Sequence, residues 1–281
     1  MKVNIIVDST TDLRPGLRDQ FTVVPLTVSF GDKEYVDGVT ISHKEFYEKL
    51  IESDVLPTTS QATPAAFEAV FAQVAERGET AVVLTLAAGL SGTYQSAVIA
   101  AEEYPGIVHV VDGTSVAIGT GILAEQALRY RDQGLSAGEI AEKLEQDKGR
   151  IHVVALLDTL EYLKKGGRIS SAVAVAGGIL SIKPVAAVKD GRIVMLGKAR
   201  GSKQGNNLLV QEIQKAGGVD FDRPLLLGYT GLSDVLLKKY VEDSKALWEN
   251  GVQQLEYVSI GSVVGTHAGP GAVAVAFFRK N

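Results

Sequence analysis

The sequence predicts an α/β protein made of two α/β domains, the first with a mainly parallel sheet and the second with a mixed or antiparallel sheet. In residues 1–150, short β-branched runs alternate with helical patterns, as in a parallel sheet covered on both faces. In residues 151–281, the turn signal Asp190-Gly191 between two apolar runs predicts a hairpin. The pattern changes near residue 150 without a linker, so we place the domain boundary there.

The first half is expected to begin with a strand at 3–8, a short helix ending near residue 20, and strands within 21–38. Ser42 and Thr63 are the expected caps of two helices, and Pro64 suits a first helical position. Segment 56–62 is expected to be a loop. The remaining elements are strands at 80–86 and 106–112 and helices near 93–104, 115–134 and 136–150.

The second half mixes hairpin and helix patterns. The expected strands are 151–157, the hairpin 182–200, 223–231, 252–261 and 272–278. The expected helices are 158–167, the small-residue run 168–181, 201–216 and 233–250.

Composition excludes several classes of protein. A net charge of −5 argues against bulk nucleic-acid binding, and the absence of cysteine excludes disulfides and thiolate metal sites. The four histidines are too scattered to suggest a metal site. The N-terminus does not resemble a signal peptide, and the longest apolar run, 172–180, is far shorter than the ~20 residues that span a bilayer. We therefore expect a soluble, cytoplasmic protein without a metal.

The segment Gly89–Thr93 follows an apolar strand and precedes a helix. Free N–H groups and the helix dipole favour an anion at such a junction, and Ser91 and Thr93 add hydroxyl donors. A simple capping role for these hydroxyls is the alternative. A serine nucleophile is a further one, because Gly89-Leu90-Ser91-Gly92 fits most of the G-x-S-x-G pattern, with His267 and Asp112 as candidate partners.

Other polar clusters are weaker signals. The hydroxyls within 58–61 fit loop filler as well as a site, and His267 lies in a glycine-rich segment expected to be a loop between two strands. His109 and His152 fall inside strand patterns, and His43 is expected to be exposed. The pattern at 119–124 lies within a helix and lacks the context of a dinucleotide fingerprint, and no P-loop sequence exists. The basic stretch 164–168 fits a solvated helix end.

Taken together, these segments resemble the DegV family of bacterial fatty-acid-binding proteins over essentially the whole chain. The resemblance is carried by "VDSTTDL" at 7–13, "TSQATP" at 59–64, "GLSGTYQSA" at 89–97, "LEYLKKGGRIS" at 160–170, "IKPV" at 182–185 and "GTHAGPGA" at 265–272. Ala62 and segment 112–119 depart mildly from the family pattern.

The resemblance implies a long-chain fatty acid, such as palmitate, in a buried tunnel between the domains, and no other cofactor. Carried over to this sequence, the carboxylate ligands would be Thr59, Ser91 and His267. Their close neighbours would be Ser60, Gly92 and Thr93.

The resemblance also implies a role as the acyl-carrying subunit of a fatty acid kinase. A separate ATP-binding subunit would phosphorylate the bound carboxylate, and Arg168, at an exposed helix end, would dock it. The chain itself would then be no enzyme. The alternatives are a Ser91-dependent acyl hydrolase and a lipid carrier without a kinase partner.

Overall fold

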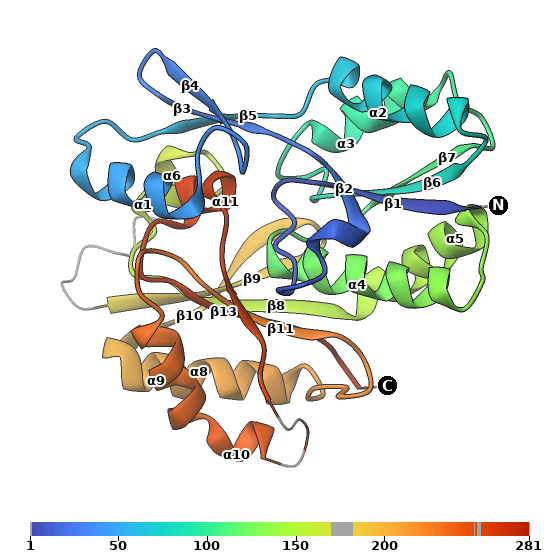
Figure 1. The fold of residues 1–281 in the computed structure, drawn as a ribbon. Coiled ribbons are helices and arrows are strands. Elements are labelled where there is room, and N and C mark those ends of the chain that lie inside the picture. Colours follow the sequence, from blue (N-terminus) through green and yellow to red (C-terminus); the bar gives the residue numbers. More distant parts are fainter. Residues whose placement is uncertain (1, 170–181, 250, 252–253, 281) are drawn as a thin grey trace.

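The computed structural model describes residues 2–169, 182–249, 251 and 254–280. Its elements form five layers, in which helices and sheets alternate (Figure 1). The predicted class, two α/β domains with a parallel and a mixed sheet, is confirmed. The boundary near residue 150 stays a prediction. The helix expected at 168–181 lies almost entirely outside the described residues.

The first sheet is entirely parallel, with the order β2-β1-β6-β7. Its strands are β1 (Val3–Asp8), β2 (Phe21–Val24), β6 (Thr80–Thr85) and β7 (Val108–Asp112). One face is covered by α2 (Pro64–Glu76) and α3 (Thr93–Ala101), and the other by α4 (Ile118–Asp132) and α5 (Ala137–Asp147). The carboxyl ends of β1 and β6 point toward the candidate site.

A small antiparallel sheet, β4-β3-β5, lies beside the parallel one. It consists of β3 (Thr27–Phe30), β4 (Lys33–Val36) and β5 (Thr58–Ser60). It packs against α11 (Ser262–Ala268), which also contacts α1 (His43–Glu52). Thr63 caps α2 through the N–H of Ala66, and Pro64 occupies its first turn, as predicted.

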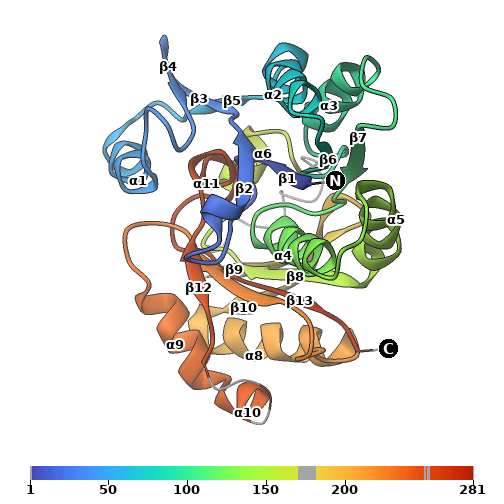
Figure 2. The same ribbon diagram turned by 45° about the vertical axis from the view of Figure 1, so that its right-hand side comes forward.

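The second sheet is mixed, with the order β10-β9-β8-β13-β11-β12, and only β11 and β12 pair in parallel. Its strands are β8 (Ile151–Leu156), β9 (Ile182–Lys189), β10 (Arg192–Arg200), β11 (Leu225–Tyr229), β12 (Tyr257–Ser259) and β13 (Val273–Phe278). Figure 2 shows α8 (Gly201–Lys215), α9 (Val235–Asp243) and α10 (Lys245–Trp248) on its outer side. Asp190 and Gly191 both take positive φ, as the predicted two-residue hairpin turn requires.

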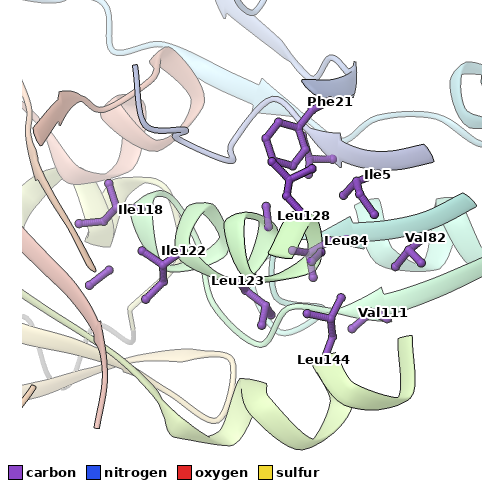
Figure 3. Packing of buried hydrophobic residues seen from close by; sticks show 14 of the residues in the cluster. Ile5, Phe21, Val82, Leu84, Val111, Ile118, Ile122, Leu123, Leu128 and Leu144 are labelled. Atoms are coloured by element: carbon purple, nitrogen blue, oxygen red, sulfur yellow. The ribbon is translucent and has the colours of Figure 1, made fainter. Parts of the chain in front are cut away.

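Helix α4 lies between the two sheets, where it contacts β1 and β6 of one and β8, β11 and β13 of the other. Ile118, Ile122 and Leu123 belong to one buried cluster with Leu84 of the parallel sheet (Figure 3). The same cluster includes Ala274 of the mixed sheet. The inner faces of both sheets therefore share one hydrophobic core.

Several elements differ from the sequence predictions. The helix expected after β1 is irregular up to a 3-10 turn, η1 (Arg18–Gln20), because Asp8 accepts hydrogen bonds from both the N–H and the hydroxyl of Thr10. The helix expected at 233–250 is divided at Ser244, whose hydroxyl donates to Tyr240 O and accepts from Trp248 Nε1. Segment 56–62, expected as a loop, contains β5. The helix expected at 136–150 ends as the 3-10 helix η2 (Lys148–Arg150). A further short helix, α6 (Glu161–Lys165), follows β8.

Candidate functional site

A cavity of about 430 Å³ lies between the inner face of the mixed sheet, the loops after β1 and β6, and α11. Its volume falls within the range of small-molecule pockets, about 300–1,000 Å³. Most of its lining is aliphatic: Leu26, Leu86, Leu90, Val116, Ile118, Val153, Leu157, Leu163, Val188, Ile193, Ile260, Val263 and Val264, with seven alanines. Such a lining suits a long apolar ligand.

Four of the polar side chains in the lining make up the candidate polar group: Thr59, Ser91, Arg168 and His267. Thr59 Oγ1 lies 3.0 Å from His267 Nε2. Arg168 Nε donates to Leu90 O at 3.2 Å, next to Ser91. Thr59, Ser91, His267 and Arg168 all line the cavity, so the structure brings the sequence-predicted residues to one place.

This polar group reaches the surface. Ser60, Gln61 and Gly92 line the cavity and are also exposed to solvent. A ligand whose polar end met Thr59 and Ser91 would therefore have that end beside the cavity mouth. The aliphatic lining would enclose the rest.

His267 belongs to the last turn of α11, and the prediction that it lies in a loop was wrong. The glycine-rich segment can be helical because Gly265 packs against Tyr47 and Phe46, where a Cβ would collide. Burial, with the charge of Arg168 adding to it, lowers the pKa of His267 to about 4. His267 is therefore neutral at pH 7. Its Nδ1 is buried and has no hydrogen-bond partner among the described residues.

Ser91 lies in the first turn leading into α3. Its Oγ lies 2.9 Å from Thr93 Oγ1 and accepts a hydrogen bond from Thr93 N at 3.3 Å. The Ser91 hydroxyl therefore helps to cap the start of α3, and its side chain is also half-buried in the cavity wall. Thr93 is fully buried behind it, and Gly92 stands at the N-cap position.

The arrangement does not support a catalytic triad. The bond of His267 Nε2 goes to Thr59, and its Nδ1 has no carboxylate partner among the described residues. Asp112 Oδ1 is instead engaged by the N–H groups of Ala88 and Thr114. A serine nucleophile needs a base within hydrogen-bond reach and a third group that orients this base.

Arg168 is half-buried, and the prediction of an exposed helix end was wrong for this residue. Its Nη1 donates to Gly166 O at 2.6 Å, and its Nε bond to Leu90 O ties it to the loop before Ser91. Arg168 is the only charged side chain in the described part of the lining. A fixed guanidinium beside neutral hydroxyls and a neutral imidazole favours an anion.

Sequence reasoning missed the role of Gln61. Its side-chain amide donates to Ser96 Oγ at 2.9 Å and lies so close to Gly92 that any Cβ there would collide with it. The glycine at position 92 was the only signal of this contact.

His43, predicted to be exposed, is half-buried against Gly261. Burial lowers the pKa of His43, while the charge of Asp37 opposes this effect.

A family model described as "DegV family" matches residues 2–280. The chain belongs to the DegV family. Among solved DegV structures, a fatty-acid-binding protein of Thermus thermophilus is 30% identical, with a TM-score of 0.88 and full coverage of both chains. A stearic-acid-binding protein of Eubacterium ventriosum is 29% identical, with a TM-score of 0.88 over 100% of this chain and 99% of that one.

A third solved structure is the Fatty Acid Kinase (Fak) B3 protein of Streptococcus pneumoniae, loaded with linoleic acid. It is 23% identical over the whole of both chains with a TM-score of 0.87, which establishes a common fold alone. Within the described parts of this DegV chain, no group of three or more His, Cys, Asp or Glu side chains is placed to hold a metal ion. No helix there has the length and apolarity to cross a membrane.

Proposed function

We propose that this chain binds a long-chain fatty acid, with the carboxylate at Thr59, Ser91 and His267 and the acyl chain in the aliphatic cavity. The observation that carries the proposal is a group of polar side chains, Thr59, Ser91, His267 and Arg168, in the wall of a mostly aliphatic cavity. The fatty-acid-binding relatives from Thermus thermophilus and Eubacterium ventriosum support it. No cofactor other than this ligand is required.

Burial of the acyl chain supplies the affinity in this proposal. Removing about 15 methylenes from water at ~0.8 kcal/mol each gives on the order of 12 kcal/mol before association and ordering costs. The carboxylate then fixes the orientation, because it accepts hydrogen bonds from hydroxyls and from the Arg168 guanidinium. Neutral His267 can donate one hydrogen bond without a charge.

Mass spectrometry of lipid extracted from the purified protein tests the binding proposal. A stoichiometric C14–C18 fatty acid is expected, and added palmitate should raise the melting temperature of delipidated protein. Thr59→Ala should reduce this rise. Thr58→Ala, an exposed neighbour outside the lining, should not. Absence of lipid together with no thermal shift would contradict the proposal.

We further propose that the chain presents the carboxylate to a separate ATP-binding subunit that forms an acyl phosphate, and that this takes place in the cytoplasm. The exposure of Ser60 and Gly92 at the polar end supports access by such a partner. Arg168, beside this mouth, would contribute to docking. ATP consumption that requires the loaded protein, palmitate and the partner subunit together would bear this out. Binding without such turnover by any cognate subunit would favour a carrier without a kinase.

A further inference from the structure

A row of small residues crosses four neighbouring strands, and its three alanines belong to the floor of the cavity. Directly paired positions are Gly228 with Ala274, Ala274 with Ala155, and Ala155 with Ala186. Directly opposite residues of paired strands share a face of the sheet, and the three alanines all line the cavity. They lie on three adjacent strands, so the alanine part of the row extends about 10 Å.

Larger side chains border this row on both sides. On one side, Val153 pairs with Val188, which pairs with Ile193, and all three line the cavity. On the other side, Leu157 extends beyond β8 and lines the cavity as well. The alanines therefore form the bottom of a trough between a ridge of three branched side chains and Leu157.

One end of the row is covered, and the other reaches the edge of the sheet. Ile260 and Ile118 lie over Gly228, at 2.9 Å and 3.1 Å from the position that a Cβ would take there. At the other end, Ala186 pairs with Met195 on the edge strand β10. The trough therefore runs across the strands from the isoleucines over Gly228 toward the edge strand β10.

We propose that the acyl chain lies in this trough, perpendicular to the strands, and that Ala155 at its centre determines the chain length the protein accepts. The proposal rests on the fatty-acid binding proposed above. The methyl group at 155 leaves space between Val153 and Leu157 for an aliphatic chain, whereas a larger side chain fills the same space. Each methylene excluded from the cavity lowers the affinity about fourfold.

The test measures affinity for a series of saturated fatty acids from octanoate to stearate, with delipidated protein. In Ala155→Leu the gain in affinity per methylene should stop at a shorter chain than in the wild type. Three added side-chain carbons should exclude a similar number of methylenes, so stearate binds about sixtyfold more weakly. Ala199→Leu is the matched control, because Ala199 is buried in β10 of the same sheet and does not line the cavity.

The outcomes separate this inference from the proposed function. Wild-type protein that binds no fatty acid would refute the function itself. Wild-type binding with an unchanged chain-length profile in Ala155→Leu, or with one equal loss at every length, would refute the trough. Ala186→Val and Ala274→Val probe the same trough with smaller additions, and they decide the question if Ala155→Leu does not fold.

Discussion

Replacing Arg168 by methionine should weaken palmitate binding about tenfold while the protein remains folded. Hydrogen bonds to charged groups contribute about 1.5–3 kcal/mol. Arg168 is half-buried, and solvent screening places the expected loss at the lower end of that range, near 1.5 kcal/mol. The carbonyls of Leu90 and Gly166 lose their guanidinium partner, but water can reach this exposed side of the mouth.

Isothermal titration calorimetry with delipidated protein measures the loss, and an NMR titration of His267 tests proximity independently. The charge of Arg168 is one of two causes that lower the pKa of His267, so Arg168→Met should raise that pKa. Arg168→Lys, which keeps the charge, is the control and should lose less affinity. Unchanged palmitate affinity in Arg168→Met would refute a role in the carboxylate site. If turnover with an ATP-binding subunit alone were lost, Arg168 would serve docking only.

Three further changes have defined expected outcomes. Ser91→Ala should weaken palmitate binding by about 1–3 kcal/mol in calorimetry, the scale of a hydrogen bond lost by a carboxylate, and equal affinity would contradict its role. The depressed pKa of His267, about 4, means that the unfolded chain takes up the proton first, so this residue costs stability as pH falls from about 6.5 to 4. Urea unfolding of His267→Gln should therefore show roughly 3 kcal/mol less loss over that interval than the wild type, and identical pH profiles would contradict the shift. Ala117, in the cavity wall, has φ 58° and ψ −131°, a backbone conformation suited to glycine. Ala117→Gly should therefore raise the free energy of unfolding by about 1 kcal/mol in thermal unfolding, and a lower free energy would contradict backbone strain at this position.

The elements with local signals were predicted well from the sequence. Thr63 and Pro64 begin α2 as expected, and Asp190-Gly191 forms the hairpin turn, because caps and turns depend on residues close in the chain. The prediction of a helix after β1 was wrong because the Asp8 carboxylate accepts a hydrogen bond from the N–H of Thr10. This interaction depends on the burial of Asp8 at the carboxyl end of β1. Helix α11 was missed because its one glycine, Gly265, packs against Tyr47, which is distant in the chain.

The residue types at the candidate site could be predicted, but their surroundings could not. Family motifs selected Thr59, Ser91 and His267, and the structure places all three in one cavity wall. The half-burial of Arg168 depends on a bond to Leu90, 78 residues away in the chain. The alanine row depends on the register of three strands, which no local pattern determines.

The position of α4 has a consequence for how the molecule unfolds. Its buried face completes the core of both sheets, so residues on either side of position 150 belong to one cluster. The two domains should therefore melt in a single calorimetric transition, with equal van't Hoff and calorimetric enthalpies. A fragment of residues 1–150 would leave Ile118 and Ile122 without the sheet that covers them. In a cell, such a half-chain would be a substrate for chaperones and proteases until the remainder had been synthesised.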